Sequence, residues 1–346
     1  MRQNTVSRRG LEHRLTLPTK IILSGNRPTG RLHLGNYTGA LENWVALQRD
    51  YRCFFMVADW HVLTTDYEHT ALIADNTREM VLDWISAGLD PESSTIFVQS
   101  HIKEHAELYL LLAMLISTAR LERNPTLKEQ VRDLEMDQGE EGVTYGHLGY
   151  PVLQAADILM YRAHAVPVGE DQLPHIEITR ELARKFNRLY GEVFPIPDGL
   201  LTKFARFPGL DGRRMSKSLG NTIDLADSPE EIQAKIKTAF TDPERKRRTD
   251  PGRPEVCLIY TYWNKFAPGK SAEIYEGCTT AKLGCVECKK MVGQAIADYL
   301  APLREKRHAL ESRAGAVEEI VNDGNERARR AAVATMELVR ERMHIG

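Results

Sequence analysis

Short apolar runs alternate with longer amphipathic stretches through the first half of the chain. Four of these runs predict buried strands, at 20–24 (KIILS), 53–58 (CFFMVA), 95–99 (TIFVQ) and 165–168 (AVPV). The stretches between them carry apolar residues at the spacing of helices that cover a sheet. This alternation is typical of a parallel sheet, so we predict an α/β fold with a doubly wound sheet.

The pattern changes near Pro229, where strand-like runs stop and helical spacing continues to the end of the sequence. We therefore expect a mostly α-helical C-terminal domain at 229–346 after a sheet domain at 19–228. Within the sheet domain, the segment 201–221 is expected to be a mobile loop. Residues 1–18 carry cations without a following apolar run, and we expect a flexible extension there rather than a targeting signal.

Charge and apolar content limit the possible partners. A formal net charge of −2 means that contact with a nucleic acid has to come from local basic patches rather than from a uniformly basic surface. No apolar run reaches the roughly 18 to 20 residues of a membrane-spanning helix. We expect a cytoplasmic protein with no membrane partner.

Two segments have the composition of an anion site. The segment GRRMSKSLGN at 212–221 places Arg213, Arg214 and Lys217 between glycines, and cations crowded into a loop indicate a polyphosphate ligand. The segment SGNRPTGRLHLGN at 24–36 follows the first strand and opens a helix, whose free N–H groups can hold a phosphate. By itself this second segment matches neither of the common phosphate-binding fingerprints, and a plain turn is the simpler interpretation.

The two segments together resemble the class I aminoacyl-tRNA synthetases, in which a HIGH tetrapeptide and a KMSKS loop close on ATP. Here HLGN at 33–36 stands for the first motif and RMSKS at 214–218 for the second. The resemblance implies that Lys217 and Arg214, with Mg²⁺, stabilise the charge on the leaving pyrophosphate. Arg214 replaces the usual lysine, and its planar guanidinium presents its charge differently from an ammonium group. We therefore assign the main part in charge stabilisation to Lys217. The catalytic residues that the resemblance implies are Lys217, Arg214, Asn36 and His33. The ATP-binding residues that it implies are Arg27, Pro28, Thr29, Gly35, Asn36, Gly169, Glu170, Asp171, Arg214, Met215, Ser216, Lys217 and Ser218.

The segment GYPVLQAADILMY at 149–161 has a helical pattern with two polar residues inside it. Gln154 and Asp157 are three residues apart and therefore share one face of the helix. A carboxylate and an amide on an apolar helix need partners, because an unpaired buried polar group is costly. A substrate N–H is one such partner. A neighbouring helix, which would make Asp157 purely structural, is the other.

This segment, with VADWH, VPVGEDQ and RRMSKS, resembles the tryptophanyl-tRNA synthetase family over about residues 20 to 345. The resemblance implies a Rossmann-like catalytic domain, a helical anticodon-recognition domain and a homodimer, with ATP, L-tryptophan and tRNA(Trp) as partners. By this resemblance Asp157 accepts a hydrogen bond from the indole N–H, and Gln154 helps to hold the amino group. The tryptophan-binding residues that it implies are Asp157, Gln154, Gln172, His61, Leu23 and Gly25.

Tyrosyl-tRNA synthetase is the nearest alternative, because it shares the Y-x-x-L-Q-A-x-D pattern that begins here at Tyr150. The tyrosine enzymes carry a tyrosine on the first strand where this chain has Leu23, and an apolar wall suits an indole better. A non-catalytic RNA-binding paralogue is a second alternative, although the candidate catalytic residues are all present. The leading hypothesis is therefore a tryptophan–tRNA ligase that forms tryptophanyl-adenylate and transfers the acyl group to tRNA(Trp).

The five cysteines fall into two groups. Cys53 stands alone in an apolar run, and the other four follow a C-x20-C-x6-C-x2-C pattern that begins at Cys257. Four thiolates at this spacing suit a tetrahedral Zn²⁺ or a [4Fe–4S] cluster equally. Some tryptophanyl-tRNA synthetases carry four cysteines at similar spacing, with a somewhat longer first gap, as ligands of a [4Fe–4S] cluster. This resemblance favours iron–sulfur over zinc, with Lys282, Lys289 and Lys290 facing the anticodon stem. The metal ligands that it implies are Cys257, Cys278, Cys285 and Cys288.

Overall fold

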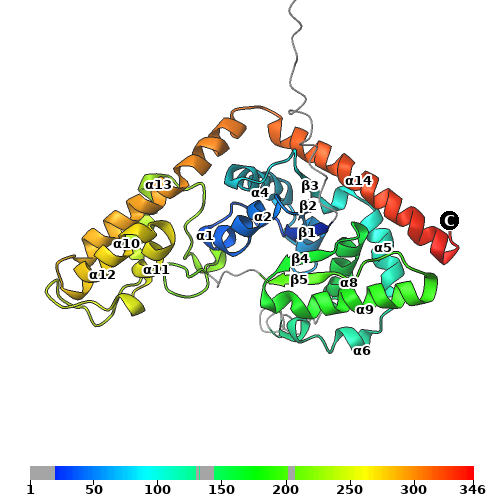
Figure 1. The fold of residues 1–346 in the computed structure, drawn as a ribbon, viewed down its shortest axis with the longest axis horizontal. Coiled ribbons are helices and arrows are strands. Elements are labelled where there is room, and N and C mark those ends of the chain that lie inside the picture. Colours follow the sequence, from blue (N-terminus) through cyan, green and yellow to red (C-terminus); the bar gives the residue numbers. More distant parts are fainter. Residues whose placement is uncertain (1–19, 130–131, 133–143, 202–206) are drawn as a thin grey trace, which may run out of the picture.

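A five-stranded parallel sheet lies at the centre of the fold, with strand order β3-β2-β1-β4-β5 (Figure 1). The computed structural model describes residues 20–129, 132, 144–201 and 207–346. The expected extension at 1–18 lies outside these residues, as do residues 202–206 of the expected mobile loop. The strands are β1 (Ile21–Asn26), β2 (Arg52–Val57), β3 (Ser94–Val98), β4 (Ala165–Val168) and β5 (Asp198–Leu201).

The predicted α/β sheet is confirmed, together with all four predicted strands. On β2, Phe55 and Val57 belong to one buried cluster, whereas Phe54 and Met56 belong to the other. Successive side chains of a strand point to opposite faces, so the sheet is buried on both sides. β5 was not predicted, because it is a short, partly exposed edge strand that contains Gly199.

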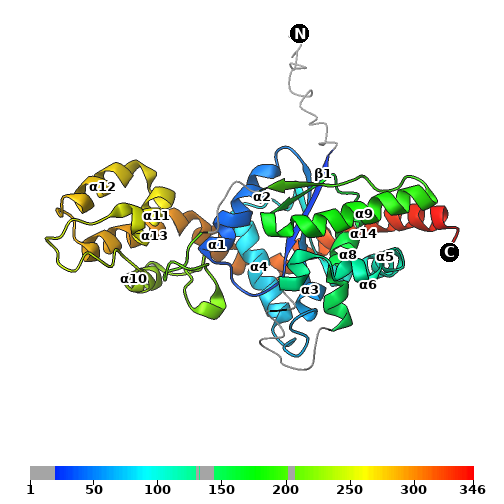
Figure 2. The same ribbon diagram turned by 90° about the horizontal axis from the view of Figure 1, so that it is seen from below.

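Helices connect the strands and cover both faces of the sheet (Figures 1 and 2). Those that precede residue 229 are α1 (Leu34–Asn36), η2 (Tyr37–Leu41), α2 (Glu42–Leu47), α3 (Asp59–Leu63), α4 (Ile73–Ala87), η3 (Gln99–His101), α5 (Glu104–Ala113), α6 (Thr118–Leu121), α8 (Tyr145–Met160), η5 (Glu170–Gln172), α9 (Leu173–Tyr190) and η6 (Lys217–Leu219). Those that follow are α10 (Pro229–Thr238), η7 (Pro254–Val256), α11 (Leu258–Phe266), η8 (Pro268–Lys270), α12 (Ser271–Thr279), α13 (Cys285–Glu311) and α14 (Ala316–Met343). Within the described residues the chain after residue 229 contains helices and no strand, as predicted. None of the described helices is both long and apolar enough to span a bilayer.

Helices α10 to α13 form an arm beside the sheet, and α13 and α14 meet as the two limbs of an inverted V (Figure 1). α14 returns to the sheet and packs along β3 and α5. Asn325 Oδ1 accepts a hydrogen bond from the Val98 backbone N–H at 2.9 Å. A Cβ on Gly324 would lie 1.7 Å from the carbonyl oxygen of Ile96, so only glycine permits this close approach. The last helix is therefore an integral part of the layer that covers the sheet.

Candidate active site and thiol pocket

The polar segments that follow the strands meet at one edge of the sheet. The turn before α1 follows β1, the segment that contains His61 follows β2, and Gln99 follows β3. Residues 169–172 follow β4. The strands are parallel, and their carboxyl ends therefore lie at the same edge, which is where ligands bind in open α/β sheets.

The turn that leads into α1 has a fixed shape. The Leu34 N–H donates to the Ile223 carbonyl at 2.8 Å, and the Leu225 N–H donates to the Leu32 carbonyl at 2.8 Å. His33 Nδ1 accepts a hydrogen bond from the Asn36 N–H at 3.3 Å, while Asn36 Oδ1 accepts one from the His33 N–H at 3.1 Å. This reciprocal capping box begins the helix, so both predicted residues are already engaged in shaping the turn.

The imidazole of His33 is neutral at physiological pH. Burial, assisted by the charges of Lys217 and Arg214, lowers the pKa of His33 to about 4. The ring proton lies on Nε2, because Nδ1 accepts the bond from the Asn36 N–H. A neutral ring with an Nε2–H donor is suited to a phosphate or ribose oxygen.

The cationic loop, which is the segment at 212–221, is folded onto this turn. Lys217 Nζ donates to the Thr29 carbonyl at 2.6 Å, and the Gly35 N–H approaches Met215 Sδ at 3.2 Å. A Cβ on Gly35 would lie 3.2 Å from Met215 Cβ, so the methionine fills the space beside this glycine. Burial lowers the pKa of Lys217. The loop is therefore in a closed arrangement in which a backbone carbonyl holds its principal cation.

The three cations of the loop make different contacts. Arg213 pairs with Asp211 at 2.7 Å and so completes the loop itself. Arg214 has an exposed side chain, and its carbonyl accepts a hydrogen bond from Asn221 Nδ2 at 3.0 Å. Lys217 alone of the three reaches across to the turn after β1. The structure therefore brings Lys217 and His33 to one place, with the charge of Arg214 near enough to affect His33.

Asp157 of α8 is the centre of a buried hydrogen-bond network. Its Oδ1 is 2.6 Å from His105 Nδ1, and its Oδ2 is 2.7 Å from His61 Nε2. Gln99 Nε2 donates to both oxygens, at 2.8 and 3.0 Å. Burial alone would raise the pKa of this carboxyl, but the hydrogen bonds from His105 and His61 leave the pKa of Asp157 below its ordinary value. Two oxygens offer about four acceptor positions, and all four are used.

Several buried polar atoms on α8 and on the elements packed around it have no hydrogen-bond partner among the described residues. Within the described residues, the buried atoms Gln154 Oε1 and His61 Nδ1 have no partner. The ring of Tyr150 lies edge-on to His61 at 5.2 Å and edge-on to His175 at 4.9 Å between ring centroids. The atoms His147 Nδ1, His147 Nε2 and His175 Nε2 are likewise buried and unpaired in the described part of the chain. Such atoms are rare in folded proteins and indicate a place where a polar ligand fits.

Sequence reasoning missed four of these residues. Gln99 and His105 stand in a polar stretch after β3, and that position at a strand end was the available signal. His147 lies about two turns before Gln154 on α8, and His175 follows the polar segment after β4. Neither histidine had a sequence feature that separated it from an ordinary helical histidine.

The remaining predicted residues lie around the same edge. Leu23 is buried in the core cluster that also contains Ala155 and Ala156 of α8. A Cβ on Gly25 would lie 2.4 Å from the Met56 carbonyl oxygen, so sheet packing itself requires this glycine. Arg27 Nη1 donates to Thr65 Oγ1 at 3.2 Å, which joins the start of the turn between β1 and α1 to the segment after α3. In the segment after β4, Gln172 Nε2 donates to Asp171 Oδ2 at 3.0 Å, and a Cβ on Gly169 would lie 2.7 Å from Asp171 Oδ1. In the cationic loop, Ser216 Oγ lies 2.9 Å from Ser218 Oγ.

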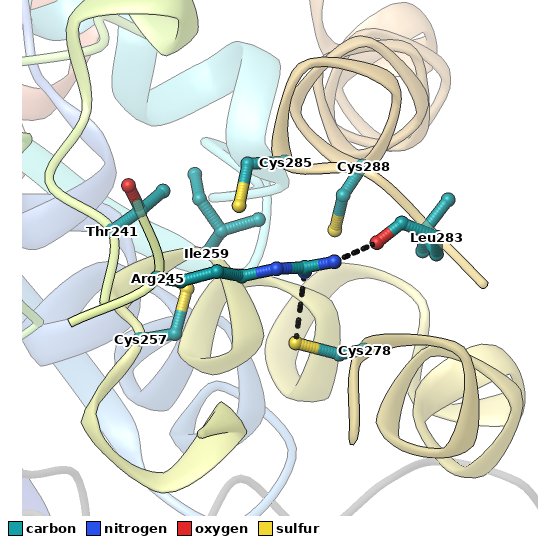
Figure 3. A pocket seen from close by; sticks show the side chains of 8 residues that line it. All are labelled: Thr241, Arg245, Cys257, Ile259, Cys278, Leu283, Cys285 and Cys288. Carbon is teal, nitrogen blue, oxygen red and sulfur yellow. Dashed lines mark hydrogen bonds between the residues drawn. The ribbon is translucent and has the colours of Figure 1, made fainter. Parts of the chain in front are cut away.

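Four thiols in the arm line one cavity (Figure 3). Its empty volume is about 260 Å³, open solvent included, and its lining residues are Thr241, Arg245, Cys257, Ile259, Cys278, Leu283, Cys285 and Cys288. Arg245 lies between the sulfurs, 3.6 Å from Cys278 Sγ and 2.8 Å from the Leu283 carbonyl. Burial is the main cause that raises the pKa of Cys288 to about 11. All four cysteines are free, and no set of three or more His, Cys, Asp or Glu among the described residues has the arrangement to hold a single metal ion.

Comparison with known proteins agrees with this geometry. A family model described as "tRNA synthetases class I (W and Y)" matches residues 18–301. The chain is 49% identical over 327 residues to a tryptophan–tRNA ligase of Thermotoga maritima, covering 94% of the chain and 99% of the relative. It is 42% identical over 392 residues to a tryptophan–tRNA ligase of Aquifex aeolicus, covering 94% and 99%. A crystal structure of tryptophanyl-tRNA synthetase from Campylobacter jejuni, complexed with ADP and tryptophan, superposes with a TM-score of 0.85 at 31% identity, covering 94% of this chain and 100% of that one.

Proposed function

Since the chain belongs to the class I tRNA synthetases of the tryptophan and tyrosine group, we propose that its nucleotide turn and cationic loop grip ATP while α8 selects the amino acid. Its function is tryptophan–tRNA ligation: it activates L-tryptophan with ATP to tryptophanyl-adenylate and transfers the acyl group to tRNA(Trp). The relatives reported above are tryptophan enzymes, which favours tryptophan over the tyrosine alternative.

Positioning and charge stabilisation are the tasks of the nucleotide site. A carboxylate oxygen of tryptophan attacks the α-phosphorus of MgATP and forms a new P–O bond. The bond from the α-phosphorus to the α,β-bridging oxygen breaks, and the β- and γ-phosphates leave as pyrophosphate, which takes the negative charge. Lys217 exchanges the Thr29 carbonyl for that leaving group, which is a stronger partner for an ammonium. His33 donates from Nε2, and Arg214 adds a second positive charge from its exposed position. The capping pair of His33 and Asn36 keeps these donors in place without reorganisation.

The tryptophan site is proposed at the carboxylate of Asp157. Gln99 is a neutral amide whose Nε2 donates to both carboxylate oxygens, and we propose that it is the partner that the substrate displaces. An indole N–H that takes its place leaves His61 and His105 to hold the carboxylate. The unpaired Gln154 Oε1, one turn before Asp157 on α8, accepts from the α-ammonium group of the substrate. This buried, unpaired acceptor beside a buried carboxylate is the observation that carries the assignment.

The other candidate residues complete the two subsites. We assign to the tryptophan side those that lie near α8 or follow β4: Leu23, Gly25, His61 and Gln172. We assign to the ATP side those of the turn after β1, the segment after β4 and the cationic loop: Arg27, Pro28, Thr29, Gly35, Gly169, Glu170, Asp171, Met215, Ser216 and Ser218.

The four thiols are proposed to hold a [4Fe–4S] cluster. All four thiols line one cavity, and a cluster of this type carries each thiolate on a separate iron. Zn²⁺ with four thiolate ligands is the alternative. When bound, the cluster would supply a structural crosslink between the start of α11, α12 and α13. Arg245 already donates to one sulfur and supplies the positive charge that deprotonated thiols need.

The arm is proposed to read the anticodon end of tRNA(Trp). The domains are then the catalytic part at 19–228 and the tRNA-recognition part at 229–346, whose last helix rests on the catalytic sheet. Arg247, Lys282 and Lys290 are exposed or half-exposed cations near the thiol pocket and suit an RNA backbone. A homodimer completes the proposed assembly.

Pyrophosphate exchange tests this function. Purified protein with ATP, labelled pyrophosphate and either tryptophan or tyrosine should show exchange with tryptophan only. Exchange driven by tyrosine, or by neither amino acid, would refute the proposed substrate. Iron and zinc analysis of protein purified without oxygen separates the cluster from its zinc alternative.

A further inference from the structure

A buried ion pair joins the arm to the nucleotide turn, apart from all the residues assigned above. Arg307 of α13 is 5% exposed and Asp83 of α4 is 1% exposed. The Arg307 guanidinium donates through Nη1 to Asp83 Oδ1. The second oxygen, Asp83 Oδ2, accepts a hydrogen bond from the Leu32 backbone N–H at 2.6 Å. One carboxylate therefore touches both α13 and the residue directly before His33.

The peptide groups around Leu32 are held on both sides. Asp83 binds its N–H, and the Leu225 N–H donates to its carbonyl at 2.8 Å. The segment after the cationic loop supplies the bond to the carbonyl, and Asp83 supplies a side-chain hydrogen bond to the N–H. Removal of Asp83 would leave a buried N–H without a partner directly before the residue that begins α1.

A second carboxylate supports the arrangement. Arg307 Nη2 donates to Glu79 Oε2 at 2.6 Å, and the same oxygen accepts from Arg31 Nε at 2.8 Å. Arg307 Nε also pairs with Glu311 at 3.0 Å, one turn along α13. Burial raises the pKa of Asp83 to about 6, and the Arg307 charge opposes that effect. The guanidinium thus keeps the carboxylate charged and fixes its direction.

Helix α13 reaches the first helix at another point as well. Tyr299 OH donates to Glu42 Oε1 at 3.0 Å and lies 3.4 Å from Tyr37 OH. The same helix begins at Cys285 in the thiol pocket. α13 therefore lines the thiol pocket, contacts the helices that follow the HLGN motif, and is linked to the turn before that motif through Asp83 and Glu79 of α4.

We propose that Asp83, oriented by Arg307, is a positioning residue for ATP that fixes the peptide before His33. The proposal rests on the proposed placement of ATP between the turn and the cationic loop. A purely structural ion pair predicts a different result, because replacing both charges by apolar residues of similar size often leaves a fold equally stable. A positioning role predicts a loss of affinity for ATP without a loss of affinity for tryptophan.

Two double variants separate these roles. Asp83→Leu with Arg307→Met removes the ion pair and the acceptor for the Leu32 N–H, whereas Asp83→Asn with Arg307→Met removes the ion pair but keeps an amide oxygen as acceptor. In tryptophan-dependent pyrophosphate exchange, the first should raise the KM for ATP about tenfold, as expected for one lost charged hydrogen bond, with the KM for tryptophan within about twofold. The second should recover most of the ATP affinity.

Arg340→Met is the matched control, since it breaks an ion pair with Glu107 between α14 and α5 far from the turn. It should leave both KM values unchanged. An unchanged KM for ATP in the leucine variant, or an equal rise in both KM values, would overturn the positioning role. If that variant does not fold, Arg307→Lys replaces it: the shorter reach should raise the KM for ATP alone, and no change refutes the proposal. Wild-type protein without tryptophan-dependent exchange would refute the proposed function instead.

Discussion

Asp157→Asn is the most informative single change, because it alters one charge at the centre of the tryptophan site. The carboxylate accepts hydrogen bonds at four positions, from His61, His105 and Gln99. An amide of the same size keeps one acceptor oxygen and places an NH₂ group where the other oxygen stood. His61 can accommodate that group, since its unpaired Nδ1 can take the ring proton and leave Nε2 as an acceptor. The fold should therefore survive the change.

The expected loss in tryptophan affinity follows from the removed charge. A hydrogen bond to a charged group contributes about 1.5 to 3 kcal/mol, which corresponds to an increase in Kd of about 10- to 150-fold. The sharper effect concerns selectivity. The wild-type site should reject 1-methyltryptophan, which lacks the indole N–H, by roughly 10⁴-fold. The variant should retain only the roughly 10- to 200-fold discrimination that a misfitting methyl group causes.

Tryptophan binding measured by calorimetry, with and without the methylated analogue, checks both numbers. Asp242→Asn is the matched control, because Asp242 is also buried and pairs with Arg253 in the arm at 2.6 Å. Its tryptophan Kd should equal that of the wild type. A folded Asp157→Asn protein that binds tryptophan normally and still rejects the analogue would show that Asp157 is only structural.

Three other predictions test the remaining parts of the account. Lys217→Ala should lower the rate of adenylate formation by roughly 10²- to 10³-fold with tryptophan Kd unchanged, as for the loss of one preorganised donor; stopped-flow kinetics that showed equal losses in rate and affinity would contradict its phosphate role. Cys285→Ser should abolish the brown colour and iron content of anaerobically purified protein, and a colourless wild type that carries zinc would refute the cluster. Acidification should destabilise the fold through His175, because its folded pKa of about 4 lies below its unfolded value of about 6.5, so that only the unfolded chain binds a proton in between and stability falls as pH drops through this window. The decrease in Tm from pH 7 to pH 4.5 should be smaller in His175→Gln, and an identical decrease in both proteins would disprove the assignment.

Much of the sheet was predictable because its strands are buried on both faces. The run CFFMV at 53–57 is apolar without interruption, which is typical of a strand between two helical layers. β5 escaped prediction because an edge strand needs no such burial. The packing of α14 against β3 could not be predicted for another reason. Its amphipathic pattern indicates that one face is buried, but it does not identify the element against which that face packs.

The parts of the site whose residues are neighbours in the sequence could be predicted. The HLGN and RMSKS segments carry their charges and glycines in a few adjacent positions, whereas the partners of Asp157 come from three separate elements. His61 of α3, Gln99 of η3 and His105 of α5 meet the carboxylate of α8 only in the folded chain. Asp83 and Arg307 are separated by more than half the chain, and no short sequence motif predicts a contact between residues so far apart.

The fit of α14 against β3 has a consequence for how the enzyme is made. Ala328, Ala332, Met336 and Val339 are buried by this docking, and Gly324 meets the backbone of a strand that was synthesised more than two hundred positions earlier. While the chain is being synthesised, the apolar surface that α14 covers therefore stays exposed to solvent until α14 itself has left the ribosome. An enzyme that supplies translation thus passes through a stage of its own synthesis in which part of its catalytic sheet is uncovered.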